Sequence, residues 1–168
     1  MILNFKRGNS KEYITALILL KLAAIGLHNK GINQWAIWLQ PDEVKINWVK
    51  EGFEAGEFYL VKTETNELAG MFRLMKEDEL YWGKQLQQAR YIHSLVVTEK
   101  FKGKNIGKQI MQQIEEQVKA SGINLLKLDC IASNTALCSY YESQGFKKTG
   151  TKQMTHSLNN LFEKQLMT

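Results

Sequence analysis

Proline and cysteine are scarce in this chain, and their scarcity excludes several classes of protein. Pro41 is the single proline among 168 residues, and no stretch is rich in glycine, serine or proline, so no linker is evident. Two cysteines, Cys130 and Cys138, are too few for a disulfide framework, and neither stands at metal-ligand spacing from histidine or aspartate. We therefore expect one domain over residues 1–168, without a metal, in a reduced cytoplasmic setting.

No apolar run is long enough to span a membrane. The run from Tyr13 to Leu27 follows basic residues and partly resembles a secretory signal, but Lys21 interrupts it. The preceding Asn9, with Glu12 three residues later, is typical of a capped helix start. We therefore expect a helix here that runs to about residue 30 and ends at Gly31.

Positive charge is modest overall but locally concentrated. The chain carries 22 basic and 17 acidic residues, a formal charge of +5, which could favour nucleic acid, a membrane surface or a phosphorylated ligand. Lys100, Lys102, Lys104 and Lys108 lie close together beside a single acid, Glu99, and there is no arginine-rich arm or zinc-finger spacing. A compact phosphate ligand fits this pattern better than a nucleic acid.

The order of the expected elements indicates a mixed α/β fold. Residues that favour β-structure, bounded by turn residues, predict strands at 2–5, 57–63, 67–75, 91–98, 125–131, 146–154 and 161–166. Helices are expected at 9–30, from 41 to about 52, at 106–120 and at 134–144. In the third helix, Ile106, Ile110, Ile114 and Val118 recur at helical spacing, so this stripe should face the core.

A glycine-containing turn joins the strand at 91–98 to the helix that starts at Ile106. Such a turn directs free backbone N–H groups and the positive end of the helix at one point, which suits phosphate. The spacing is one residue too short for a P-loop, and no hydroxyl follows Lys108, so an NTPase is excluded. A Rossmann fingerprint lacks its third glycine. The expected phosphate-binding residues are Lys102, Gly103, Lys104, Asn105, Ile106, Gly107 and Lys108.

A second motif follows about thirty residues later. The segment from Asn134 to Phe146 combines a polar helix start, a tyrosine (Tyr141) one turn before the helix end, and a Gly-Phe exit. Together the two motifs resemble the GNAT superfamily of acyl-CoA-dependent N-acyltransferases, specifically from Tyr91 to Phe146. The family turn reads Arg/Gln-x-x-Gly-x-Gly/Ala, and here Lys102 and Asn105 depart from that pattern.

The resemblance implies a fold and a cofactor. It implies a mostly antiparallel central sheet of about six to seven strands, flanked by about four helices, with a splayed pair of parallel strands at the cofactor cleft. The backbone of Leu95, Val96 and Val97 would bind the pantetheine of acetyl-CoA, and the Leu95 N–H would hold the oxyanion. Asn134 would hydrogen-bond pantetheine, unless it only caps its helix.

The resemblance also implies an acid and a base. Tyr141 would protonate the leaving thiolate, or would merely pack its helix on the sheet. His93 would take a proton from the attacking amine, or would be structural while water carries that proton. Acceptor recognition would fall to Gln34 and Trp35, although Trp35 could equally belong to the core. The acidic residues 77–79 offer negative charge that would attract a cationic amine.

These residues favour an N-acetyltransferase that moves acetyl from acetyl-CoA to a primary amine by direct attack in a ternary complex. The alternative is a non-catalytic acyl-CoA-binding module, which would need the turn and Asn134 but neither Tyr141 nor His93. The expected acceptor is a small-molecule or peptide amine, and we expect no nucleic acid or membrane partner. A homodimer is compatible with the sequence.

Overall fold

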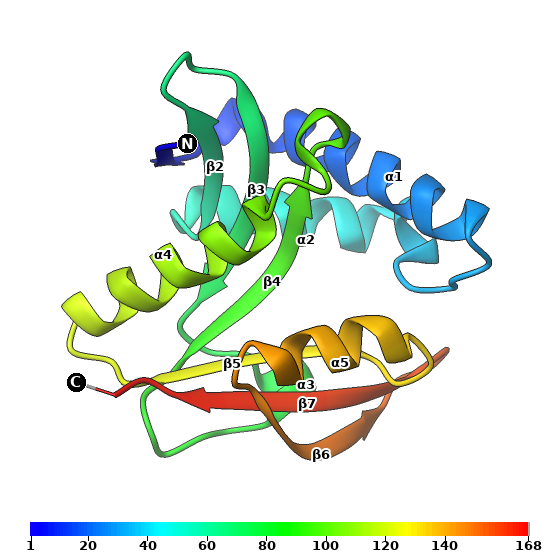
Figure 1. Ribbon diagram of the computed structural model, residues 1–168. Coiled ribbons are helices and arrows are strands. Elements are labelled where there is room, and N and C mark those ends of the chain that lie inside the picture. Colours follow the sequence, from blue (N-terminus) through cyan, green and yellow to red (C-terminus); the bar gives the residue numbers. More distant parts are fainter. Residues whose placement is uncertain (168) are drawn as a thin grey trace. The chain divides into compact units, whose positions relative to one another are not determined.

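Residues 1–167 are described by a computed structural model, shown as a ribbon in Figure 1. Over this range the chain forms seven strands: β1 (Leu3–Arg7), β2 (Phe58–Thr63), β3 (Leu68–Met75), β4 (Arg90–Val97), β5 (Leu125–Ile131), β6 (Lys147–Gln153) and β7 (Leu158–Gln165). The same range holds five α-helices: α1 (Tyr13–Asn29), α2 (Glu43–Glu54), α3 (Glu79–Trp82), α4 (Ile106–Ala120) and α5 (Thr135–Ser143).

The strands are hydrogen-bonded in the order β1-β2-β3-β4-β5-β7-β6. β1 pairs with β2, β2 with β3, β5 with β7 and β6 with β7 in antiparallel fashion. β4 and β5 are parallel, with Arg90 opposite Leu126 and Tyr91 opposite Lys127. The expected mixed, mostly antiparallel sheet with one parallel pair is therefore confirmed.

The chain folds as two compact units, and β4 and α4 each contribute to both. Unit 1 comprises residues 1–74 and 94–110, and unit 2 comprises residues 75–93 with the chain from 111 onward. The expectation of a single domain stays a prediction.

In unit 1, helices α1 and α2 pack on the strands β2 and β3. Their buried side chains form one core with Leu20, Val49, Phe58 and Met71 among its members. The rings of Phe53 and Phe58 stack with centroids 4.5 Å apart. Burial of such side chains contributes roughly 1.5–3 kcal/mol each, so this apolar core is what holds unit 1 together.

Local chemistry sets the start of the short 3₁₀ helix Ser10–Glu12, which leads directly into α1, and the end of α1. The Asn9 side chain accepts a hydrogen bond from the Lys11 N–H at 3.0 Å, and the Glu12 carboxylate accepts one from the Asn9 N–H at 2.8 Å. This capping box satisfies N–H groups that the first turn leaves unpaired. At the other end, Gly31 takes a left-handed backbone with φ 72, which glycine adopts without strain.

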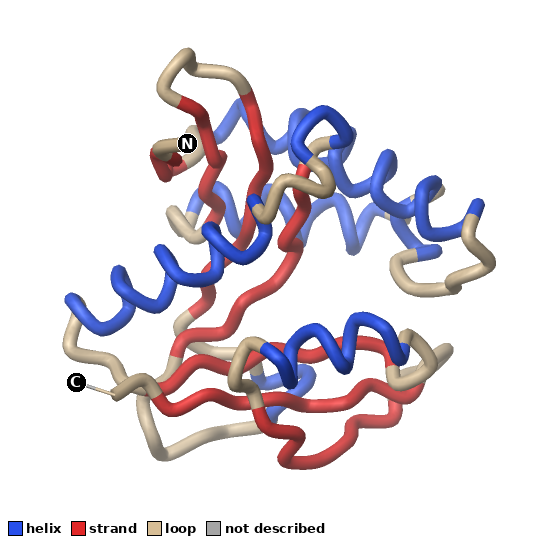
Figure 2. Tube along the Cα trace, in the orientation of Figure 1, coloured by secondary structure: helices blue, strands red, loops and turns tan. Residues whose placement is uncertain are grey.

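In unit 2, α5 packs on the antiparallel strands β5, β7 and β6, which Figure 2 shows in red beneath the blue helix. Tyr141 of α5 contacts Phe162 of β7 at 6.2 Å between ring centroids and Phe146 at 6.0 Å. A second cluster joins Tyr91 of β4 and Leu125 of β5, with the half-buried Trp82 packed against it. These contacts fix α5 and the start of β4 on the strands of unit 2.

Two features were not expected from the sequence. The four-residue helix α3 is too short to show a hydrophobic period, so no sequence pattern predicts it. β7 begins at Leu158, three residues before the expected start, because Leu158 and Asn159 pair with Gln153 and Lys152 of β6.

Over residues 1–167, no helix is long and apolar enough to cross a membrane. The cytoplasmic setting stays a prediction.

Candidate active site

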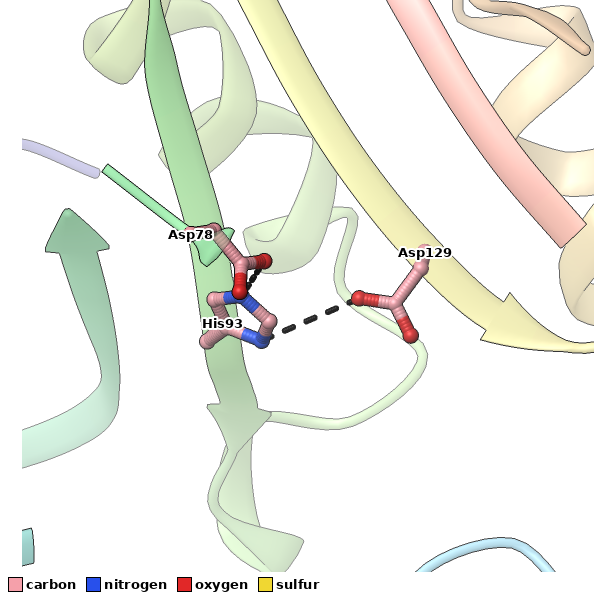
Figure 3. Close-up of side chains that lie close together, drawn as sticks. All are labelled: Asp78, His93 and Asp129. Atoms are coloured by element: carbon pink, nitrogen blue, oxygen red, sulfur yellow. Dashed lines mark hydrogen bonds and ion pairs between the residues drawn. The ribbon is translucent and has the colours of Figure 1, made fainter. Parts of the chain in front are cut away.

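A histidine held between two aspartates is the most distinctive polar feature of unit 2 (Figure 3). His93 lies on β4, and its Nε2 is 2.8 Å from the Asp78 Oδ2. Its Nδ1 is 3.8 Å from the Asp129 Oδ1, which lies on β5. The two ring nitrogens therefore face different carboxylates, one at hydrogen-bonding distance and one beyond it.

Asp78 is held in place by the short helix α3. It is the residue that caps α3, and its Oδ1 accepts a long hydrogen bond from the Tyr81 N–H at 3.4 Å. Its other oxygen contacts His93, and the residue is buried, with 6% of its surface exposed. The cap thus fixes the carboxylate that orients the imidazole ring.

Asp129 is held in place by a side chain of β7, the strand that neighbours β5. Asn159 of β7 donates a hydrogen bond from Nδ2 to the Asp129 Oδ2 at 2.7 Å, and Ser157 donates to the Asn159 Oδ1 at 2.7 Å. Burial raises the pKa of Asp129, and Asp78 raises it further, while His93 and the Asn159 hydrogen bond act in the lowering direction. Asp129 is therefore an acid with one oxygen anchored and one facing the histidine.

The cluster carries more negative than positive charge. Among residues 1–167, His93 is the only basic side chain that forms an ion pair with Asp78 or Asp129. One imidazole can neutralise only one of the two carboxylates. One ligand atom from each of the three residues lies within 4.8 Å of the other two, so the group could hold a cation. Excess negative charge in a half-buried place is typical of a functional site.

The negative charge of these carboxylates helps to raise the pKa of two tyrosines. The Tyr81 ring lies 5.6 Å from the His93 ring, and burial, then Asp129 and Asp78, raise the pKa of Tyr81. Burial, followed by Cys130 and Asp129, raises the pKa of Tyr141. Both hydroxyls therefore keep their protons at neutral pH, and Tyr141 belongs to the same neighbourhood as the cluster.

Tyr141 also packs its helix against the sheet, which is the alternative role that the sequence leaves open for it. It is buried, with 9% of its surface exposed, and it contacts Phe146 and Phe162. Cys138, one turn earlier on α5, lies with its Sγ 3.2 Å from the Sγ of Cys130, and both thiols are free and buried. Packing and proton donation are compatible for Tyr141, and its role as the acid stays a prediction.

The strand that carries His93 has an irregular backbone at the next residue. Ser94 takes a left-handed conformation with φ 55 inside β4. Non-glycine residues adopt this region rarely, and such a residue interrupts the regular alternation of a strand. The simple alternation that would place His93 on one side with Leu95 and Val97 therefore does not apply across Ser94.

Beyond Ser94, the backbone of β4 in unit 1 presents alternate residues to opposite edges. The Val96 carbonyl oxygen lies against Gly70 of β3, where an added Cβ would clash with it, and the Thr98 N–H donates to the Ala69 carbonyl at 2.9 Å. Val96 and Thr98 thus face β3. Because successive residues of a strand alternate, the N–H and C=O groups of Leu95 and Val97 are directed to the other edge.

Two residues in the turn after β4 have a positive φ. Gly103 and Asn105 are both left-handed, with φ 72 and φ 58. The Gln109 N–H donates to the Asn105 carbonyl as the first bond of α4, so the N–H groups of Ile106, Gly107 and Lys108 have no helical acceptor. The turn therefore offers several backbone donors and the positive helix end to an anion.

The lysines of this turn already have partners within unit 1. Lys102 Nζ is 2.6 Å from the Glu99 carboxylate, and Lys100 pairs with Glu67. Lys104 Nζ lies 5.5 Å from the centre of the Phe101 ring. These side chains are exposed pairs that contribute little to stability, so an anionic ligand can compete for the lysines at small cost.

The remaining expected site residues have clear structural positions. Asn134 caps α5 by accepting a hydrogen bond from the Leu137 N–H at 3.2 Å, so capping is confirmed and contact with pantetheine stays a prediction. Gln34 is buried in unit 1, and Trp35 is a half-buried residue with φ 65 that packs against the core of that unit. Trp38 belongs to that core. Acceptor binding by Gln34 and Trp35 stays a prediction.

Sequence reasoning found His93 but missed both of its partners. Asp129 is an acid within the otherwise largely apolar strand β5, and that unusual position was the available signal. Asp78 was noticed only as part of an acidic run. Nothing in the sequence indicated that α3 would direct Asp78 to His93.

The sequence matches one known family over most of its length. Residues 30–146 match the model of the Acetyltransferase (GNAT) family. The chain belongs to this family. GNAT membership makes the chain an acyltransferase and agrees with its sheet order and its parallel β4–β5 pair.

Relatives of similar length support this assignment. The uncharacterized N-acetyltransferase YesJ of Bacillus subtilis is 28% identical over 160 residues, covering 92% of this chain and 84% of YesJ. A GNAT acetyltransferase structure from Listeria monocytogenes 4b F2365 superposes with a TM-score of 0.80 at 25% identity, covering 98% of this chain and 95% of that one. The acetyltransferase yncA from Salmonella typhimurium, solved with its cofactor acetyl-CoA, shares the fold at a TM-score of 0.66 and 12% identity, covering 100% of this chain and 96% of that one.

Proposed function

We propose that this GNAT protein transfers an acetyl group from acetyl-CoA to a primary amine by direct attack in a ternary complex. The observation that carries the proposal is His93, held by Asp78 in the unit that also contains Tyr141. A module that only bound acyl-CoA would need no such acid–base cluster. The relative yncA, solved with acetyl-CoA, supports the choice of cofactor.

Cofactor binding is assigned to backbone groups of unit 1. The free N–H groups at the start of α4 and the left-handed Gly103 and Asn105 suit a pyrophosphate. The outward-directed backbone of Leu95 and Val97 suits pairing with pantetheine, and the Leu95 N–H is the proposed oxyanion donor. Lys102, Lys104 and Lys108 add positive charge at the same turn.

The proposed reaction needs two proton movements. An alkyl amine is protonated at neutral pH, since its pKa is about 10, so His93 first takes one proton from it. The neutral nitrogen then attacks the thioester carbonyl carbon, the C–N bond forms, and the oxyanion is held by the backbone. On collapse the C–S bond breaks and Tyr141 gives its proton to the leaving thiolate. The second proton of the nitrogen passes through water to Tyr141 and restores its hydroxyl. The imidazolium finally releases its proton to water.

The test follows coenzyme A thiol release when the protein is mixed with acetyl-CoA and a panel of primary amines. In the Tyr141→Phe variant we expect kcat to fall about 10- to 100-fold with a small change in KM, because a general acid acts in the transition state. Unchanged turnover in this variant would remove Tyr141 as the acid. Tight acetyl-CoA binding without turnover of any amine would favour the non-catalytic module.

A further inference from the structure

A gap of defined size separates His93 from Asp129. The distance of 3.8 Å between Nδ1 and Oδ1 is too long for a direct hydrogen bond. A donor nitrogen at an ordinary distance of about 2.8 Å from each atom can bridge them, because two acceptors at this spacing fit two N–H groups of one nitrogen. The pair is therefore arranged to receive a donor with at least two hydrogens.

Asp78 decides which ring nitrogen can accept a proton. A carboxylate at 2.8 Å from Nε2 requires the hydrogen of a neutral imidazole to be on Nε2. The lone pair is then on Nδ1, on the side that faces Asp129. The bridging donor would meet one basic nitrogen and one carboxylate oxygen.

The charge of the cluster favours a cation in this place. Two carboxylates share one imidazole, and Asn159, the other side chain bonded to Asp129, is neutral. Lys127 is on the same strand as Asp129, but its ammonium is engaged by Gln85 and lies over the Trp82 ring. A positively charged ligand would relieve the burial cost of the Asp129 carboxylate.

An ammonium group fits the arrangement better than a metal ion. Catalytic zinc sites take three protein ligands. The imidazole can give an ion only one nitrogen, and the Asp78 oxygen that contacts His93 is bonded to the nitrogen turned away from Asp129. An ion at Nδ1 would thus have one nitrogen and Asp129 as ligands, whereas an ammonium needs only these two acceptors.

We propose that Asp129 binds the ammonium form of the acceptor and that His93 Nδ1 receives its proton, so that protonated alkylamines are the substrates of this enzyme. This inference rests on the proposed acetyl transfer. In the step, one N–H bond of the ammonium breaks and an Nδ1–H bond forms. The neutral amine remains hydrogen-bonded to Asp129, and the imidazolium is held by Asp78 and Asp129. Asp78 is then a positioning residue and Asp129 a specificity-determining one.

The test compares two amines of similar shape, cyclohexylamine, which is protonated at pH 7.5, and aniline, which is neutral. In Asp129→Asn we expect KM for cyclohexylamine to rise about 10- to 100-fold, as for loss of a charged hydrogen bond, and KM for aniline to change less than about twofold. The exposed Glu116→Gln variant removes one negative charge from α4 and should leave both values unchanged. Equal effects on the two amines, or better turnover of aniline by the native enzyme, would overturn the inference.

A binding measurement keeps this inference separate from acetyl transfer. Cyclohexylammonium should raise the Tm of the native protein and fail to raise that of Asp129→Asn, even without acetyl-CoA. Absence of turnover together with this shift would reject the proposed function and retain the cation site. No shift in the native protein, or loss of activity in EDTA that zinc restores, would reject the ammonium site.

Discussion

The two compact units differ in whether their buried charged side chains are fully paired with opposite charge. In unit 1, Arg73 is nearly buried, yet its guanidinium contacts the Glu57 carboxylate at 2.6 Å, donates to the Trp48 carbonyl at 2.9 Å and lies 4.0 Å from the centre of the Trp48 ring. In unit 2, over the described residues up to 167, His93 is the one basic side chain paired with the carboxylates of Asp78 and Asp129. A buried charge that is paired with an opposite charge is typical of a structural role, and a buried charge that lacks such a pair is typical of a functional site. The difference supports the proposal that the acid–base residues lie in unit 2.

The largest expected effect is on activity in unit 2. His93→Gln keeps a polar side chain but cannot accept and release a proton, so kcat/KM for an alkylamine should fall about 100- to 10,000-fold. Steady-state thiol release checks this. His156→Gln makes the same chemical change in the exposed turn between β6 and β7 and should retain native activity. If His93→Gln keeps full activity, water carries the proton and the unmatched cluster is not the base.

The next effect is on stability in unit 1. Glu57→Gln leaves the Arg73 guanidinium without its carboxylate, and because Glu57 is partly exposed we expect a loss of about 1–3 kcal/mol in the free energy of unfolding. Urea unfolding measures it. Glu54→Gln, an exposed change at the end of α2, should stay within about 0.5 kcal/mol of the native protein. Equal stability of the two variants would contradict a structural role for the Arg73 pair.

Sequence reasoning succeeded where a few neighbouring residues decide the structure. The Asn9 capping box, the apolar stripe of α4 and the bounds of β5 all follow from short-range patterns, and each was predicted. The left-handed Gly103 also follows from local chemistry. Such features depend on backbone preferences that a sequence displays directly.

The parts that were missed depend on segments far apart in the chain. Asp78 reaches His93 across 15 positions, and Asn159 reaches Asp129 across 30. Such contacts are set by strand order and by a four-residue helix, neither of which has a sequence period. The acid–base residue could thus be proposed from a family pattern, while the residues that orient it required the structure.

The smallest expected effect is on the pH dependence of thermal stability, and it concerns Asp129 in unit 2. Because burial raises the pKa of Asp129, ionising it costs more in the folded than in the unfolded chain. The contribution of Asp129 to the free energy of unfolding is fully present below the pKa that Asp129 has in the unfolded chain. It is lost as pH rises through the raised pKa that Asp129 has in the folded protein. Asp129→Asn cannot ionise and can still bond Asn159, so its Tm should exceed that of the native protein at pH 7.5, with the gain shrinking toward pH 4.

The control for this prediction lies in unit 1. Asp42→Asn keeps a good cap for α2, where the native side chain accepts from the Lys45 N–H at 2.9 Å, so its Tm should track the native value at both pH values. Among residues 1–167, the titratable groups that interact with the Asp129 carboxylate are His93, Asp78, Tyr81, Cys130 and Tyr141, and His93 is the basic one among them. A Tm of Asp129→Asn below the native value at pH 7.5 would mean that His93 fully stabilises the carboxylate. The cluster would then be a matched charge like that of Arg73, and the contrast between the units would fail.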